Sequence, residues 1–118
     1  MYNSINQDDL KYALAAIKKD GDAFKKMSLE LRSNPKIVLA AVRKKGRMLL
    51  FASHALCGDR EIILAAVRNQ GRVIRCASHV LRGDREIFLA AVRSQGKAFR
   101  FASKKLRTDR EFVLSIAK

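Results

Sequence analysis

The sequence predicts an all-α protein, a short α-solenoid of about four and a half helix-turn-helix repeats of 25 residues each. The first observation behind this prediction is a leucine that recurs at a fixed interval, at Leu14, Leu39, Leu64, Leu89 and Leu114. The second is a helix-capping residue ahead of an apolar run in each period. The third is an amphipathic segment that follows the run. A fixed period of this length is typical of stacked repeats, in which no single unit buries its own apolar face.

The register divides the chain into a single predicted domain, 1–118, with repeats at 9–33, 34–58, 59–83 and 84–108 and a half-repeat at 109–118. Glycines and capping residues keep the same spacing, at Gly21, Gly46, Gly71 and Gly96 and at Asp9, Asn34, Asp59, Asp84 and Asp109. A chain of this length buries roughly 65% of the surface that its unfolded form exposes, so one core needs no staple.

The first half of each repeat predicts a helix that begins after the capping residue. Asp59 suits an N-cap, and Asn34 is followed by Pro35 at the first helical position. The body at 61–67, EIILAAV, is apolar nearly all round and is followed by Arg68 and a glycine stop at Gly71. We therefore expect these inner helices to be sandwiched between neighbours. A buried strand is the alternative, but the cap, the proline and the paired alanines favour a helix.

The second half of each repeat predicts one amphipathic outer helix of about ten residues. At 72–82, RVIRCASHVLR, the apolar stripe consists of Val73, Ile74, Cys76, Ala77, Val80 and Leu81. The opposite face carries Arg72, Arg75, Ser78, His79 and Arg82, and the segments at 22–32, 47–57 and 97–107 follow the same plan. The recurring serine is interpreted as a mid-helix residue that bonds a carbonyl four residues back or keeps a helix contact close.

The composition is that of a folded chain, with 48% hydrophobic and 31% charged residues. No apolar run reaches the roughly 18 residues that would span a bilayer, so no membrane association is expected. The N-terminal stretch lacks the cationic segment and apolar core of a signal peptide. Cys57 and Cys76 are too few for a disulfide framework, which predicts a reducing, cytoplasmic location.

The repeat has a recognisable pattern, Asp-Arg-Glu-Ile-x-Leu-Ala-Ala-Val-Arg-x-x-Gly followed by an Ala-Ser segment that ends in leucine, at 59–81 and 84–106. This pattern resembles the short helical repeats of domain-of-unknown-function family 4116, from about Asp9 onward. The first repeat departs from it at Met27 and Leu29, and the last stops after one helix.

That resemblance implies a function rather than a chemistry. Repeats of this family occur in effector proteins of intracellular bacteria and in some protists, which implies an effector-associated binding module, delivered into a host-cell cytosol. A short stand-alone array also looks like an inhibitor or adaptor that regulates a co-delivered effector enzyme, such as a ubiquitin-modifying deamidase. The family carries no catalytic residues to transfer.

The titratable residues predict neither an enzyme nor a cofactor or metal site. The recurring aspartates are assigned to caps, and Glu61, Glu86 and Glu111 complement helix dipoles in first turns. His54 and His79 are one repeat apart, about 10 Å at helix-packing distance, too far to share a metal. His54 and Cys57 could supply two ligands, but no third is evident.

The charge is strongly positive, with 25 Lys and Arg against 11 Asp and Glu, for a net charge of +14. On the outer helices the cations form three ladders: Arg47, Arg72 and Lys97; Lys25, Arg75 and Arg100; Arg32, Arg82 and Arg107. Stacked repeats bring like charges together, which favours docking of an acidic protein partner. A merely solvated face is the plain alternative. Nucleic acid is the second candidate partner, but aromatic residues are only 7% and tryptophan is absent.

Two leucines interrupt these ladders. Leu50 stands in the slot of Lys25, Arg75 and Arg100, and Leu29 stands in the slot of the residues His54, His79 and Lys104. We expect both leucines to be exposed and to form a small apolar patch with a charged rim. The predicted partner-binding set is therefore Lys25, Leu29, Arg47, Leu50, His54, Arg72, Arg75, His79, Lys97, Arg100 and Lys104.

The last helix predicts an oligomer contact. Phe112, Val113 and Ile116 lie on a terminal half-repeat that no following repeat covers. Solenoids need a polar terminal face, so either the array is longer than this chain or the face closes against a second copy in a symmetric homodimer. We expect the homodimer.

Overall fold

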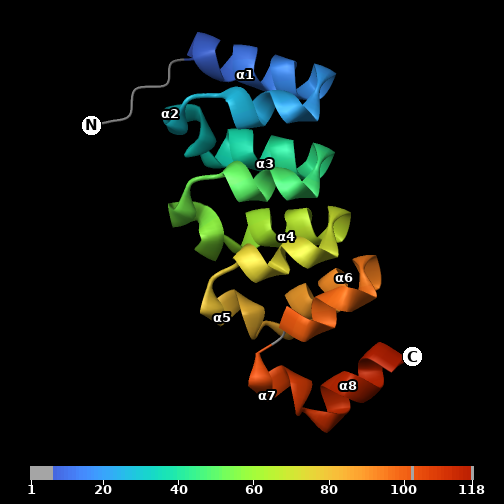
Figure 1. The fold of residues 1–118 in the computed structure, drawn as a ribbon. Helices are drawn as coiled ribbons and strands as arrows, with labels where there is room; N and C mark the ends of the chain where they lie inside the picture. Colours follow the sequence, from blue (N-terminus) through green and yellow to red (C-terminus); the bar gives the residue numbers. More distant parts are fainter. Residues whose placement is uncertain (1–6, 102, 118) are drawn as a thin grey trace.

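A column of α-helices runs through the molecule, as the computed structural model of the chain shows (Figure 1). The structure describes residues 7–101 and 103–117, and the side chains of residues 8–101 and 103–114. Every regular element in these ranges is helical, which confirms the α-solenoid. The molecule is elongated, with extents of 50 × 29 × 17 Å. No helix within the described ranges has both the length and the apolar character needed to cross a bilayer.

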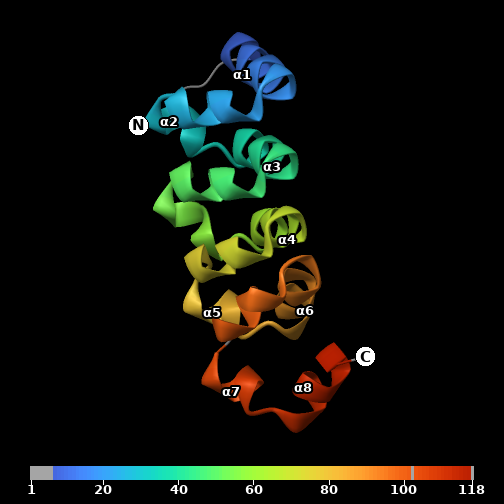
Figure 2. The same ribbon diagram turned by 45° about the vertical axis from the view of Figure 1, so that its right-hand side comes forward.

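The long helices of successive repeats stack side by side in one column (Figure 2). They are α1 (Gln7–Lys19), α3 (Pro35–Lys44), α4 (Arg60–Asn69), α6 (Arg85–Ser94) and α8 (Arg110–Ala117). Each contacts the next along the stack. These elements are the predicted inner helices.

The predicted N-caps determine where these helices begin. Oδ1 of Asp59 accepts a hydrogen bond from the backbone N of Ile62 at 3.2 Å, and Oδ1 of Asp84 accepts one from the backbone N of Ile87 at 3.0 Å. Because a capping side chain satisfies a first-turn amide, these bonds confirm the helical interpretation over the strand alternative. Asp9 differs, since it lies in the first turn of α1 and not ahead of it.

The second half of each repeat is not the single α-helix that the pattern predicts. It begins with a 3₁₀ helix, in η1 (Gly21–Lys26), η2 (Gly46–Phe51), η4 (Gly71–Cys76) and η5 (Gly96–Phe101). A break follows, and then comes a short second turn, in α2 (Leu29–Arg32), η3 (His54–Gly58), α5 (His79–Arg82) and α7 (Lys104–Arg107). The prediction of one continuous outer helix is therefore wrong, although the segment does form the second column.

The break has a local cause in the Ala-Ser pair. Ala77 is extended, with φ −75° and ψ 157°, and Oγ of Ser78 accepts a hydrogen bond from the backbone N of Leu81 at 3.4 Å. Serine thus starts a new turn as an N-cap and is not a mid-helix residue. The new turn has its own orientation, so Leu81 is 8% exposed while Val80, assigned to the apolar stripe, is 79% exposed.

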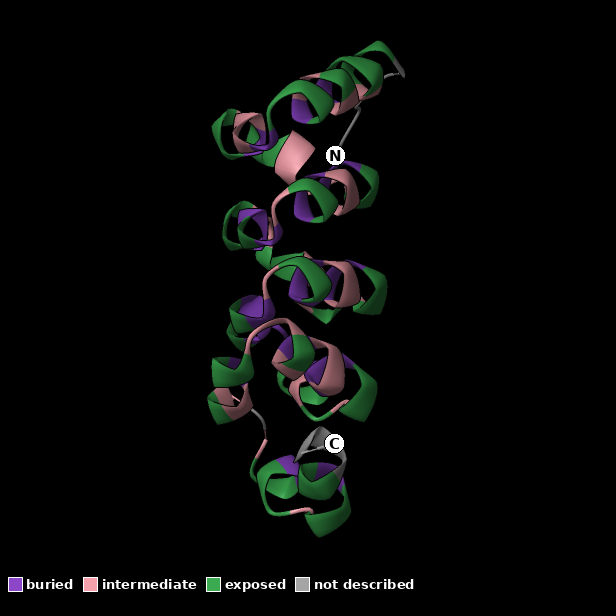
Figure 3. Ribbon diagram, turned by 90° about the vertical axis from the view of Figure 1, so that its right-hand side faces the viewer, coloured by how far each residue is buried: buried purple, intermediate pink, exposed green. Residues whose placement is uncertain are grey.

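The core lies between the two columns. In α4 the buried residues are Ile62, Ile63, Ala66 and Val67, and Ile74 of η4 packs with them. Figure 3 shows the buried parts of the α-helices facing the second column and the exposed parts facing away from it. Leu64 and Ala65 are only half-buried. α4 is sandwiched between α3 and α6 as expected, but the side that carries Leu64 and Ala65 is not fully covered.

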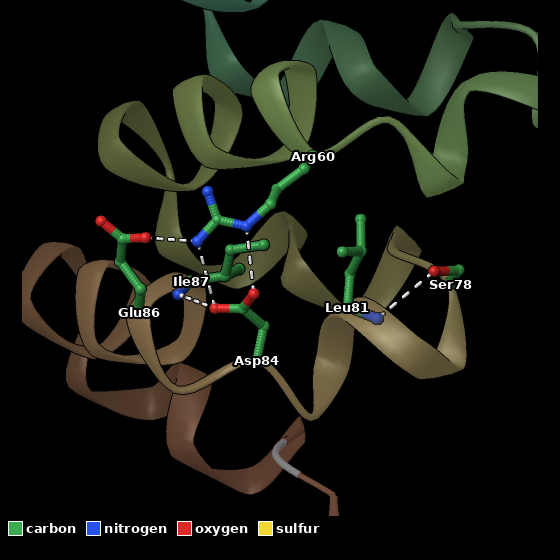
Figure 4. Close-up of polar contacts among 6 residues, drawn as sticks. All are labelled: Arg60, Ser78, Leu81, Asp84, Glu86 and Ile87. Atoms are coloured by element: carbon green, nitrogen blue, oxygen red, sulfur yellow. Dashed lines mark hydrogen bonds and ion pairs between the residues drawn. The ribbon is translucent and has the colours of Figure 1, made fainter.

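Polar contacts join one repeat to the next. Nε of Arg60 donates to Oδ2 of Asp84 at 3.1 Å, and Arg60 also pairs with Glu86 (Figure 4). Arg32 and Arg82, from the third predicted ladder, donate to the backbone oxygens of Phe51 and Phe101, at 2.8 Å and 3.2 Å. These arginines hold the array together and are not simply available to a partner.

Candidate protein-docking surfaces

The 3₁₀ segments present the predicted cations on one exposed face, which we name the outer surface and define by Lys25, Arg47, Arg72, Arg75, Lys97 and Arg100. All six residues are exposed. A 3₁₀ helix has about three residues per turn, so side chains three positions apart are eclipsed. Arg72 and Arg75 therefore stand on the same side of η4, while Val73 and Ile74 between them are buried. The two predicted ladders consequently merge into one face.

A shallow hollow on this face brings four of the predicted partner-binding residues together. It is lined by Arg47, Leu50, Arg72 and Arg75, together with Gln70, Val73 and Phe101. Leu50 is 50% exposed, as expected. Within the described part of the chain, the guanidinium groups of Arg47, Arg72 and Arg75 have no ion pair. An apolar side chain therefore lies among three arginines that form no ion pair with the described residues.

The other predicted partner residues lie at the starts of the short second turns. Leu29, His54, His79 and Lys104 are the first residues of α2, η3, α5 and α7, and all are exposed, Leu29 by 61%. Leu29 is not among the residues that line the hollow at Leu50. The joint Leu29 and Leu50 patch stays a prediction.

Cys57, Cys76 and His54 are the side chains that bear on metal and thiol chemistry at these positions. Sγ of Cys57 lies 3.8 Å from Nδ1 of His54, and no group of three or more His, Cys, Asp and Glu side chains gathers within the described ranges. Burial raises the pKa of the Cys57 thiol and, as the largest influence, that of the Cys76 thiol. Both thiols are therefore held in their protonated form, in which they are weak nucleophiles and poor ligands.

The column of α-helices carries a second surface that the sequence analysis did not assign. In α4, Leu64 and Ala65 form a half-buried floor between Glu61 and Arg68, which are exposed. These positions follow the i, i+3, i+4, i+7 rule of one helix face. We name this face, with its equivalents in α1, α3 and α6, the inner surface. The exposed charge at each end of the apolar run is the signal that could have identified it.

Each junction between neighbouring helices of the inner surface is hollowed. The hollow between α1 and α3 is lined by Leu14, Ile17, Lys18, Ala40, Arg43 and Lys44. The hollow between α3 and α4 is lined by Arg43, Glu61, Leu64, Ala65, Arg68 and Asn69. The hollow between α4 and α6 is lined by Arg68, Glu86, Leu89, Ala90, Arg93 and Ser94. Arg43 and Arg68 are each shared by two adjoining hollows, so the three form a continuous row.

The structure of α8 shows that one of the three predicted dimer residues, Phe112, is buried. Phe112 is 2% exposed, and the guanidinium carbon of Arg85 lies 5.9 Å from the centroid of its ring. Phe112 therefore belongs to the core and cannot serve as an interface residue, because α8 turns it toward α6. Val113 is 38% and Leu114 is 55% exposed. The side chain of Ile116 lies outside the described residues.

Comparison with known proteins identifies the repeat. No curated protein and no solved structure gives a significant match. A family model described as a domain of unknown function, DUF4116, matches residues 9–57, 35–82, 59–107 and 84–118. Each of the first three matches spans two of the 25-residue units, and successive matches begin one unit further along. Because the four together reach from residue 9 to residue 118, the chain belongs to the DUF4116 family.

Proposed function

We propose that this chain is a non-enzymatic protein-binding module that engages an acidic patch on a partner protein through its outer surface. The observation that carries the proposal is the hollow at Leu50, where an exposed apolar side chain is surrounded by Arg47, Arg72 and Arg75. Apolar centres with charged rims are typical of protein interfaces. Arginine is also enriched at such contacts because its planar head pairs with carboxylates in two places at once.

The electrostatic argument concerns the arrangement of the cations as well as their number. Stacked repeats hold Arg47, Arg72 and Lys97 at equivalent positions of consecutive 3₁₀ segments that contact one another. Like charges held side by side repel, and an acidic partner relieves that repulsion on binding. The same positive face raises the association rate of an acidic protein.

The proposed biological role follows from the family resemblance. The chain would act as an adaptor or inhibitor of an effector enzyme, such as a ubiquitin-modifying deamidase, in the cytosol to which effectors are delivered. A rigid array that covers part of an enzyme's surface can block its substrate without any chemistry of its own.

The test isolates the partner and then disrupts the outer surface. The tagged chain captures binders from native lysate at moderate salt, mass spectrometry identifies them, and calorimetry with the purified partner gives the Kd. We expect the double variant Arg72→Glu with Arg75→Glu to raise the Kd at least about tenfold, which corresponds to about 1.4 kcal/mol.

Two further variants make the result specific. Leu50→Asp with Leu29→Asp should abolish binding and leave the circular dichroism spectrum unchanged, because both side chains are exposed. Arg68→Glu with Arg93→Glu, an equal charge change on the inner surface, is the matched control and should leave the Kd unchanged. Full affinity in the Arg72→Glu and Arg75→Glu variant would exclude the outer surface as the docking site.

A salt series separates this function from nucleic-acid binding. A phosphate-only binder should lose about 10³-fold or more in affinity for a duplex DNA probe between about 50 and 200 mM salt. A protein complex centred on Leu50 should persist. Duplex binding that survives at the higher salt, with no protein partner recovered, would assign the outer surface to nucleic acid instead.

We also propose that the chain forms a homodimer through α8. The exposed side chains of Val113 and Leu114 support this contact. The buried side chain of Phe112 packs α8 onto the core, so that these two side chains face outward. Sedimentation equilibrium at micromolar concentration should show a dimer, and Leu114→Asp should convert it to a monomer. A wild-type monomer at that concentration would remove the proposal.

A further inference from the structure

The three hollows of the inner surface repeat at an interval that matches the distance between every third side chain of an extended peptide. We propose that the inner surface binds an extended, acidic peptide segment with an apolar residue at every third position. The apolar side chains would seat on the Leu-Ala floors, one in each hollow. This inference goes beyond the outer-surface function and stands on different residues.

The spacing of the hollows selects the conformation of the peptide. Packed helices lie about 8 to 10 Å apart, so consecutive hollows repeat at that distance. A polyproline II segment has about three residues per turn and rises about 3.1 Å per residue, so every third side chain falls on one face at intervals of about 9.3 Å. A β-strand does not match, because side chains three residues apart point to opposite faces.

The width of the surface argues against a helical ligand. Glu61 and Arg68, which border the floor in α4, are seven positions apart in the sequence. Seven residues of α-helix rise about 10.5 Å, whereas a helix with its side chains is about 10 to 12 Å across. Once the bordering side chains project into this space, a helix has to push them apart. An extended chain fits between them.

The charges select an acidic sequence. The row is bordered on one edge by Lys18, Arg43, Arg68 and Arg93, at equivalent positions of four helices. In the described part of the chain, Arg43, Arg68 and Arg93 have no side-chain hydrogen bond or ion pair. On the other edge, Glu86 is already paired with Arg60, and Glu61 is the remaining carboxylate that lines the row. The unpaired charge is therefore mainly positive, and carboxylates along the basic edge would complement it.

The test uses a synthetic probe. A fluorescein-labelled peptide of about four Leu-Glu-Pro repeats would reach about 37 Å in polyproline II, enough to cross all three hollows. We expect saturable binding by fluorescence polarisation. A peptide of the same composition in scrambled order should bind at least about tenfold more weakly, because its leucines no longer meet the hollows in register.

Protein variants locate the binding site. Arg43→Glu with Arg68→Glu should weaken the Leu-Glu-Pro peptide at least about tenfold. Arg75→Glu, on the outer surface, should leave peptide binding unchanged while it weakens the partner of the proposed function, so the two proposals fail separately. All these arginines are exposed, and circular dichroism verifies that each variant keeps its helices.

Three outcomes would overturn the inference. The first is the absence of saturable binding by the repeat peptide. The second is equal binding of the repeat and scrambled peptides, or equal weakening by Arg75→Glu, which would reduce the effect to general charge attraction. The third is tighter binding by a helical acidic peptide with leucines at i, i+3, i+4 and i+7, which would make a helix the occupant.

Discussion

Arg60 and Asp84 form the clearest junction between two repeats, with Nε of Arg60 3.1 Å from Oδ2 of Asp84 (Figure 4). The other carboxylate oxygen of Asp84 accepts a hydrogen bond from the backbone N of Ile87 at 3.0 Å. One side chain therefore begins its own helix and joins that helix to the preceding repeat. Arg85 and Asp109 pair in the same way at the next junction.

The two roles of Asp84 can be separated by substitution. Asparagine caps a helix about as well as aspartate but carries no charge, so Asp84→Asn removes the ion pair and keeps the cap. Because the Arg60 and Asp84 side chains are 47% and 25% exposed, we expect a loss of about 0.5 to 1 kcal/mol in the free energy of unfolding. Asp84→Ala should cost about 1 kcal/mol more. Urea denaturation followed by circular dichroism measures both.

Asp59 provides the matched control for this prediction. Asp59 caps α4 as Asp84 caps α6. The residue 24 positions before Asp84 is Arg60, its ion-pair partner, but the residue 24 positions before Asp59 is Pro35, which cannot form an ion pair. Asp59→Asn should therefore change stability by only a few tenths of a kcal/mol. Equal losses at Asp59 and Asp84 would show that the arginine contact contributes nothing.

The same carboxylates predict how stability depends on pH. Partial burial tends to raise the pKa of Asp84, but hydrogen bonds from Arg60 and the backbone of Ile87 outweigh it and hold the pKa below its usual value. A hydrogen bond from the backbone N of Phe112, with the charge of Arg85, likewise lowers the pKa of Asp109.

A depressed pKa in the folded state means that the unfolded chain binds more protons in acid. The stabilisation is therefore complete above the unfolded pKa of about 3.9 and is lost as the pH falls through the lower folded value. Urea midpoints at a series of pH values should decline below about pH 4. The gap between wild type and Asp84→Asn should close over the same range; a constant gap would contradict the assignment.

The sequence allowed the long helices to be predicted, because their signals are local. Each signal is a capping residue and the apolar run that follows it within one or two helical turns, as at Asp59 and at Asn34 with Pro35. The division of the second segment was missed because its hydrophobic pattern suits an α-helix over 72–82, while Ser78 makes a cap only if Ala77 is extended. The backbone either continues as one helix through Ala77 and Ser78 or breaks there so that Ser78 caps a new turn. The spacing of the hydrophobic residues does not show which of these two hydrogen-bond patterns forms.

The candidate surfaces were predictable to different degrees. The exposure of Arg72, Arg75 and Leu50 could be predicted, because these residues stand at repeat positions that mostly carry polar side chains in the other repeats. The inner surface was missed because EIILAAV contains more apolar residues than one neighbouring column can cover, and sequence alone does not say which of them remain half-exposed. Packing leaves Leu64 and Ala65 in that position. Phe112 was misassigned because the length of the array does not show how α8 is rotated.

The serine caps give a prediction with an internal control. Oγ of Ser78 accepts a hydrogen bond from the backbone N of Leu81, whereas Ser53, at the equivalent position, makes no side-chain cap bond. Ser78→Ala should lower the free energy of unfolding by about 1 kcal/mol, and Ser53→Ala should have little effect. Urea denaturation of the two variants side by side decides this; equal losses would mean that the hydroxyl has another role in both repeats.

The recurring glycines should respond unequally to the same substitution. A Cβ on Gly71 would overlap the backbone oxygen of Ala91 and lie 3.0 Å from the backbone N of Gln95, so α6 would have to move. A Cβ on Gly96, one repeat later, would have no heavy atom of the described residues within 4 Å. The glycine at 71 is therefore required by the close approach of the next helix.

We accordingly expect Gly71→Ala to destabilise the protein by about 1 to 3 kcal/mol, the usual range for overpacking. Gly96→Ala should be neutral or should stabilise by up to about 1 kcal/mol, because alanine restricts the unfolded chain. Thermal unfolding of both variants tests the difference in sign. A loss at Gly96 as large as that at Gly71 would mean that the glycines serve the 3₁₀ backbone itself, whereas a loss confined to Gly71 ties the glycine to the contact between repeats.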